Sequence, residues 1–200
     1  SIFSGLNNLK VSTVFRGGFA DACGYTKEEV EKLAHDLGHE DKLAELAEWY
    51  DGYDIQGREI YNPWSINNYF SEHCEAEAYW VNTSGNDIIQ TLLAQADEER
   101  WGELQSLLTG GTVTTAISEG VIYSTIGKNS GDIYTMLLQT GYLKAIGSVR
   151  LGGGERMYEL AIPNREIRML FQKEIMNRVD RSYGVVSFYK MGLALQQGRA

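Results

Sequence analysis

Apolar positions recur three and four residues apart in the first half of the chain, and this spacing predicts a series of helices. The first begins after Thr26, because Glu29 stands at the capping-box position, and it is expected to end at Gly38. Its buried stripe is predicted to comprise Val30, Leu33, Ala34 and Leu37. A second helix is predicted to end at the turn dipeptide Asp51-Gly52.

Turn and cap signals divide the stretch that follows. Residues 53–60 predict a short turn or hairpin. Asn62 and Pro63 are predicted to begin a third helix, with asparagine as its N-cap. Proline suits the first helical position, because the backbone N–H that it lacks would have no partner within the helix there. Residues 79–82 are expected to be extended, and Ser84 is expected to cap a fourth helix.

The pattern changes in the second half of the chain. A fifth helix is predicted to end at residues 110–111, and β-branched residues then favour an extended segment over 112–123. The elements predicted next are a helix at 130–141, strands at 142–149 and 157–162, and a helix from Pro163 to Val179. A helix followed by a glycine-tipped wing is the order of a winged helix. The sequence therefore predicts a mainly α (α+β) fold, with a helical lid-like bundle followed by a winged-helix-like unit with a two-stranded hairpin.

Three clusters combine aromatic residues with short polar side chains. They are WYDGY at Trp49 to Tyr53, YNPWSINNY at Tyr61 to Tyr69, and YWVNTSGND at Tyr79 to Asp87. Tyrosine and tryptophan have an apolar body and a polar tip, so they suit junctions where packed surfaces must also satisfy polar groups. Each cluster lies at a predicted helix boundary. We interpret the clusters as junctions between helices, with a partner-binding surface as the alternative.

Charge is distributed unevenly around the net value of −9. Residues 21–140 hold twenty-two acidic and six basic side chains, whereas residues 141–200 hold five acidic and ten basic. The first part should repel polyanions, whereas the last part could bind nucleic acid, with Arg150 and Arg156 on the wing as candidate contacts. Interleaved acidic residues leave ordinary solvated faces as the alternative. The candidate recognition helix, at 132–142, contains no basic residue.

Several classes of protein are disfavoured by the sequence. No segment approaches the roughly 18 consecutive apolar residues of a spanning helix, so we expect a cytoplasmic chain with no membrane partner. Two cysteines are too few for a disulfide framework. Gly127-Lys128 lacks the rest of a phosphate-binding motif, and His35 and His39 lack a third metal ligand nearby. The chain alone is expected to catalyse nothing and to hold no metal.

Seven segments spread over nearly the whole chain carry a family resemblance. They are SIFSGLNNL, CGYTKEEV, WYDGY, YNPWSINNYF, YWVNTSGND, MLLQTGYL and YELAIPNREIRMLF. With these motifs in this order, the sequence resembles the AAA-ATPase-like family of bacterial proteins. The resemblance implies a P-loop ATPase module, a helical region with these motifs, and often a PD-(D/E)XK nuclease-like domain. One departure is the segment from Phe15 to Phe19, where relatives more often have a polar, acidic stretch.

The resemblance also implies that this chain is the middle of a longer protein. The implied regions are the end of the ATPase core or a linker at 1–20, a helical lid-like region at 21–111, a winged-helix-like region at 112–182, and the start of the nuclease-like domain at 183–200. The implied partners are the missing N-terminal ATPase core and the C-terminal nuclease-like domain. ATP and Mg would then bind the parent protein rather than this chain, whose segments include no catalytic residue of either activity.

Four residues are the first candidates for a contact with the missing core and its nucleotide. Trp80, Asn82, Thr83 and Ser84 precede a predicted helix N-terminus, where an N-cap beside a packed tryptophan is the alternative. We therefore expect the lid and winged-helix-like portion of an ATP-driven regulator, which relays nucleotide state to a partner or an adjoining domain. The alternatives are a nucleic-acid-binding module and a protein-interaction module.

Overall fold

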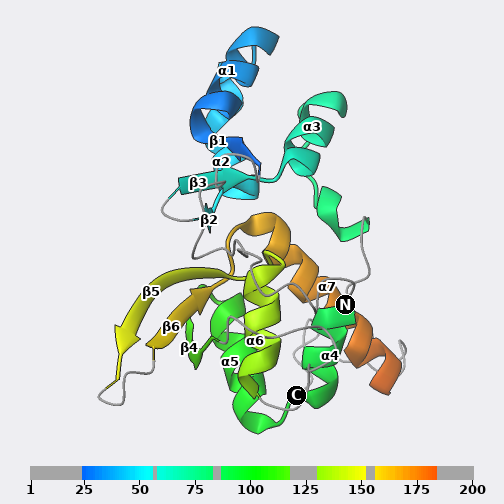
Figure 1. Cartoon of the computed structure of the whole chain (residues 1–200). Helices are drawn as coiled ribbons and strands as arrows, with labels where there is room; N and C mark the ends of the chain where they lie inside the picture. The colour runs from blue at the N-terminus through cyan, green and yellow to red at the C-terminus, as the bar shows by residue number, and fades with distance from the viewer. Residues whose placement is uncertain (1–23, 56–57, 83–86, 118–129, 152–155, 184–200) are drawn as a thin grey trace, which may run out of the picture.

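The structure, a computed structural model, describes residues 24–55, 58–82, 87–117, 130–151 and 156–183. Its fold is α+β, with helices and two three-stranded antiparallel sheets. Figure 1 shows two units, one above the other in that view. We call residues 24–77 the first unit and residues 87–183 the second unit, and the 3-10 helix η3 (Tyr79–Asn82) lies between them in the chain. Within the described residues, no helix is long and apolar enough to cross a membrane.

The first unit packs helices around one small sheet. Its elements are β1 (Tyr25–Thr26), α1 (Lys27–Leu37), η2 (Glu40–Lys42), α2 (Leu43–Tyr50), β2 (Tyr53–Ile55), β3 (Arg58–Tyr61) and α3 (Pro63–Ser71). The strand order is β1-β3-β2, so the predicted hairpin is confirmed and gains a short third strand. The core consists of Val30, Leu46, Trp49, Tyr50, Tyr61, Ile66, Tyr69 and Cys74.

Local signals set the ends of these helices. At the start of α1, Glu29 N donates to Thr26 Oγ1 at 3.3 Å and Thr26 N donates to Glu29 Oε2 at 2.9 Å, which confirms the capping box. Gly38 ends the helix with a φ of +75°. Asn62 caps α3, since its side chain accepts a hydrogen bond from the backbone N–H of the helix. Leu37, predicted to be buried, is 49% exposed, because α1 ends where the first unit projects into solvent (Figure 1).

The second unit contains the predicted wing. Its elements are α4 (Asp87–Gln95), α5 (Glu98–Leu108), β4 (Val113–Ala116), α6 (Ser130–Gln139), β5 (Lys144–Arg150), β6 (Arg156–Ala161) and α7 (Arg165–Tyr183). The strand order is β4-β6-β5, so β4 adds a third strand to the expected two-stranded hairpin. Its core includes Ile89, Leu92, Leu104, Leu107, Ile133, Leu137, Leu143, Leu160, Ile167, Leu170 and Phe171.

One predicted element is wrong: residues 79–82 form the 3-10 helix η3 rather than an extended segment. The reason is a tertiary contact. The backbone N–H of Trp80, in the first turn of η3, donates to the side chain of Glu166 at 2.8 Å. The first N–H groups of a helix have no partner within the helix, so a buried carboxylate can hold the turn from outside.

The two units approach each other closely at Gly52, and this contact predicts a large mutational effect. A Cβ at Gly52 would lie 2.3 Å from the carbonyl oxygen of Pro163, and the φ of Gly52 is +108°. Gly110 provides a matched control, since its φ is +89° but nothing lies within 4 Å of the position of a Cβ. We expect Gly110→Ala to cost about 1–2 kcal/mol from backbone strain alone, and Gly52→Ala to cost clearly more.

Denaturant unfolding of both variants measures this difference. The backbone of Pro163 cannot rotate away as a side chain could, so the extra cost at Gly52 should appear as a lower unfolding midpoint with a similar slope. Equal midpoints for Gly52→Ala and Gly110→Ala would contradict the close approach of the two units.

Candidate functional site

The two units are joined through the buried carboxylate of Glu166, in the first turn of α7. Ser65 Oγ, on α3, donates to the two carboxylate oxygens at 3.0 and 2.8 Å, and Trp80 N donates to Oε1 at 2.8 Å. Glu166 and Ser65 are both 0% exposed. The contacts join residues 101 and 86 positions apart in the sequence. We call Glu166, Ser65 and Trp80 the joint.

Burial dominates the electrostatics of the joint. Removal from water raises the pKa of the Glu166 carboxyl, because the charged form loses its hydration. The hydrogen bonds from Trp80 and Ser65 oppose this rise only in part. The protonation state of Glu166 is therefore sensitive to any movement that admits water or brings a cation to the joint.

Aromatic rings enclose the joint on the side of the second core. Trp80 stacks on Tyr142 with ring centroids 5.1 Å apart and planes 8° apart, and Tyr53 meets Trp80 edge-on at 6.3 Å. The turn before Tyr142 depends on Gly141, whose φ is +83° and whose Cβ would lie 3.0 Å from Tyr53 Cε1. Glycine at this turn therefore lets the rings from β2, η3 and the segment between α6 and β5 pack together.

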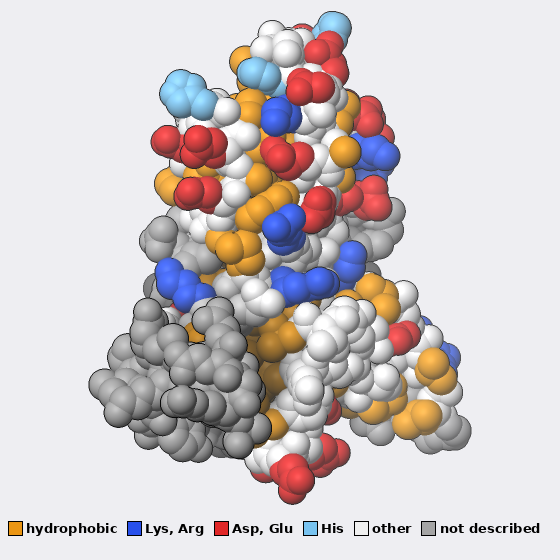
Figure 2. Space-filling model, turned by 180° about the vertical axis from the view of Figure 1, so that it is seen from behind, with side chains coloured by type: hydrophobic (Ala, Val, Ile, Leu, Met, Phe, Trp, Pro, Cys, Tyr) orange, Lys and Arg blue, Asp and Glu red, His pale blue; other side chains and the backbone are white. Residues whose placement is uncertain are grey.

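A groove of about 580 Å³ opens between α2 and the first turns of α7. It is lined by Glu48, Pro163, Asn164, Arg165, Arg168, Met169 and Gln172. Arg165 is held in place, because its Nη1 lies 2.7 Å from Glu48 Oε1 and its guanidinium carbon lies 4.6 Å from the centre of the Trp49 ring. Figure 2 shows basic side chains gathered at the level where the two units meet.

Arg168 Nε is buried at the start of α7 and has no hydrogen-bond partner among the described residues. The Asn164 side chain lies beside the Tyr53 hydroxyl and partly offsets the rise that burial causes in the pKa of that hydroxyl. Asn164 also caps the helix, because its Oδ1 accepts a hydrogen bond from Ile167 N at 3.0 Å. An unpaired buried donor costs free energy, and Arg168 lines the groove.

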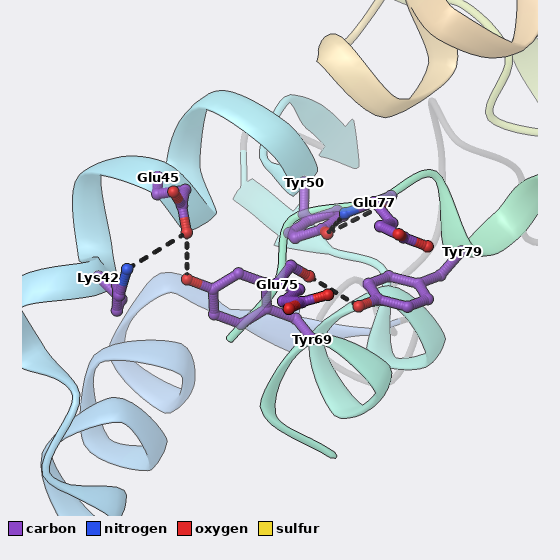
Figure 3. A network of polar contacts seen from close by, with 7 residues as sticks. All are labelled: Lys42, Glu45, Tyr50, Tyr69, Glu75, Glu77 and Tyr79. Carbon is purple, nitrogen blue, oxygen red and sulfur yellow. Dashed lines mark hydrogen bonds and ion pairs between the residues drawn. The ribbon is translucent and has the colours of Figure 1, made fainter. Parts of the chain in front are cut away.

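Tyrosine hydroxyls attach the loop before η3 to the first unit (Figure 3). Tyr50 Oη donates to Glu77 O at 2.9 Å and accepts from Glu77 N at 3.1 Å, while Tyr69 donates to Glu45. The Tyr79 hydroxyl donates to a carbonyl four residues earlier at 2.7 Å, and burial raises its pKa to about 12. These hydroxyls therefore remain donors at neutral pH, and the start of η3 is anchored to the first unit.

The sequence-predicted contact residues fall in different places. Trp80 belongs to the joint, where its ring stacks on Tyr142 and its backbone N–H donates a hydrogen bond to Glu166. Asn82 ends η3, and Thr83 and Ser84 lie outside the described residues. Contact of this segment with an ATPase core stays a prediction.

The aromatic clusters are divided between interior and surface. Trp49 is 8% exposed, whereas Trp64 is 53% exposed and donates its Nε1–H to Tyr79 O at 3.3 Å. The interpretation as helix junctions agrees with these contacts, because one ring fills the first core and the other holds η3. Trp64 nevertheless leaves one large exposed ring for a partner.

The helix before the wing cannot serve the candidate nucleic-acid contacts as a recognition helix. Arg150 and Arg156 are exposed and face each other at the ends of β5 and β6. The helix before the wing, α6, buries every residue from Ile133 to Leu138. A helix with that much of its surface covered cannot enter a DNA groove without unfolding its surroundings.

Glu166 is the functional candidate that the sequence reasoning missed. The signal was available in the helical spacing, because Glu166 stands four residues before Leu170 and so falls on the apolar stripe of the last helix. A carboxylate on such a stripe must be paired or hydrogen-bonded. Its partners, however, could not be identified from the spacing. Among the described residues, no three His, Cys, Asp or Glu side chains come together as metal ligands.

Comparison with known proteins identifies a distant relative. An uncharacterized protein in the vnfD 5' region of Azotobacter chroococcum mcd 1 is 29% identical to this chain over 181 residues. The match covers 89% of this chain and 32% of that protein, so the chain spans about a third of its relative's length. No family model matches the chain, and no solved structure matches it.

The raised pKa of Glu166 predicts how stability depends on pH. Between the ordinary value of 4.5 and the raised value, the folded chain holds a proton that the unfolded chain has released. The free energy of unfolding should therefore fall as pH rises through this window. Glu166→Gln removes the titration, so its stability should change less over the same pH range.

Chemical denaturation at a series of pH values above 4.5 tests this expectation. Glu31→Gln is a suitable control, because Glu31 is exposed on α1, and it should follow the wild-type profile. A Glu166→Gln profile parallel to wild type would show that this carboxyl does not titrate in the window.

Proposed function

We propose that this chain is the lid and winged-helix-like portion of an AAA-type ATP-binding protein, and that it relays the nucleotide state of a preceding core to a partner or an adjoining domain. One observation carries the proposal: five of the family-like motifs each supply one residue to the joint or its enclosure. These residues are Tyr53, Ser65, Trp80, Tyr142 and Glu166. Motifs that identify a resemblance thus converge at the contact between the two units.

The arrangement of the cores supports a relay. Each unit has its own apolar core, and the two meet at polar contacts centred on Glu166 and at the rings of Tyr53 and Trp80, which pack against the second core. Packed cores move as rigid bodies, whereas a hydrogen-bonded contact can be exchanged for another in a single step. A change in the joint would therefore rotate one unit against the other and shift the Tyr53 ring on the second core.

The groove beside the joint is where we place the input. Arg168 lines it with a donor that lacks a partner among the described residues, and α7 presents its N-terminal end there. An acceptor group on the preceding core would satisfy this donor and shift the start of α7. In this proposal ATP and Mg bind the core of the parent protein, and this chain senses the result.

Removing one hydrogen bond from the joint should uncouple the relay. In the full-length protein, Ser65→Ala leaves Glu166 with fewer donors and should reduce ATP turnover several-fold at a cost of about 1–3 kcal/mol in stability. Ser106→Ala is the matched control, because Ser106 Oγ donates to Thr112 O at 3.3 Å within the second unit, away from the joint. Hydrogen exchange in α3 and α7, measured with and without ATP, should respond in wild type and in Ser106→Ala but not in Ser65→Ala.

Two results would overturn the proposal. One is a full-length protein that neither binds nor hydrolyses ATP. The other is an ATP response in α3 and α7 that Ser65→Ala leaves unchanged.

Arg168→Met separates function from stability at the groove. Methionine keeps the apolar stem of Arg168 and removes the buried, unpartnered Nε, so the unfolding temperature should stay equal or rise. ATP turnover of the full-length protein should nevertheless fall. A variant that is less stable but fully active would assign Arg168 to the fold instead of the relay.

A further inference from the structure

The wing carries an exposed apolar surface at the end away from the joint. Val149 pairs with Met157, which in turn pairs with Ala116, so one face of the sheet presents an apolar row across all three strands. Val149 is 64% exposed and Leu151, directly after β5, is 49% exposed. Figure 2 shows hydrophobic side chains gathered at the lower right, where the wing projects. Exposed apolar side chains that cluster in this way mark interaction sites.

Strand β5 also offers an open backbone edge. The strand order β4-β6-β5 puts β5 at the end of the sheet, so one side of its backbone has no strand partner among the described residues. Its only register shift lies between Ala145 and Gly147, and pairing with β6 is regular from Gly147 to Arg150. Unpaired N–H and C=O groups along a regular edge are a template for an added strand.

The opposite face of the same tip is cationic. Arg150 pairs with Arg156 across the two strands, both are exposed, and no ion pair involves either of them within the described residues. Like charges directly opposite each other on a sheet destabilise it. Because successive side chains point to opposite faces, the apolar row and the arginine pair lie on opposite sides of the wing tip.

We propose that the wing binds an extended acidic polypeptide segment, which adds to the edge of β5 as a fourth strand. The apolar row on one face of the wing and the arginine pair on the other determine which residues the partner must present. Apolar residues of the partner would cover Val149 and Leu151, and the alternating acidic residues would lie beside Arg150, with the charge of Arg156 one strand further into the sheet. The inference does not depend on the nucleotide relay.

A polypeptide fits this surface better than a nucleic acid does. Phosphates would meet the two arginines but would leave the apolar row uncovered, and they could not pair with the backbone edge of β5. The burial of α6 also removes the helix that a winged helix places in the groove of DNA. On the face shown in Figure 2, acidic side chains gather mainly on the first unit, so an acidic partner would be repelled there and would contact the wing locally.

Fluorescence anisotropy with a synthetic labelled peptide tests this inference on the intact chain. The probe alternates glutamate and valine, and a second probe replaces each glutamate with lysine. The Glu/Val peptide should bind and the Lys/Val peptide should not. The double reversal Arg150→Glu with Arg156→Glu should weaken the Glu/Val peptide by about 10-fold or more and should create binding of the Lys/Val peptide.

A matched control variant makes the same change in charge elsewhere. Lys27→Glu with Lys32→Glu alters two exposed residues of α1, in the first unit, and should leave binding of the Glu/Val peptide unchanged. Circular dichroism confirms that both double variants are folded. The proposal is overturned if the Glu/Val peptide fails to bind wild type at low salt, or if the Arg150 and Arg156 reversal leaves its affinity unchanged. Binding of duplex DNA instead of the peptide would also overturn it and restore the nucleic-acid interpretation.

Discussion

The burial of the Glu166 carboxylate constrains how the two units can be arranged. A carboxylate that is 0% exposed must find hydrogen-bond donors, and its donors come from α3 and η3. These elements must therefore keep a fixed position relative to the first turn of α7. The close approach of Gly52 to Pro163, and the rings around Gly141, follow from the same requirement. Each unit could fill its own core without the joint, but their mutual orientation depends on it.

A polar joint behaves differently from an apolar interface. The stabilisation from apolar contacts decreases gradually as two surfaces slide apart. A buried carboxylate, in contrast, is either fully hydrogen-bonded or destabilises the structure by several kcal/mol. The contact between the units therefore favours discrete arrangements over a continuum. The Arg168 Nε donor at the same end of α7, which has no partner among the described residues, adds to this, because an acceptor that reached it would stabilise one arrangement over the other.

One continuous segment connects the wing with the joint. Strand β6 ends at Ala161, and α7 begins only a few residues later at Arg165. The short connection is itself immobilised, since Ile162 and Asn164 are each 6% exposed. A displacement of the wing would therefore reach Glu166 through a stiff path rather than through a loop. Events at the wing and at the groove thus act on the same helix, although the two surfaces have different chemistry.

The sequence by itself determined the features that depend on neighbours along the chain. The capping box of Thr26 and Glu29, the cap at Asn62, the glycine stop at Gly38 and the order of helix and wing could all be predicted, because each is decided within a few residues. Only the tertiary structure decided the joint. The 3-10 turn of η3, the stacking of Trp80 and the burial of Glu166 depend on residues about 60 to 100 positions apart, whose approach no local pattern encodes.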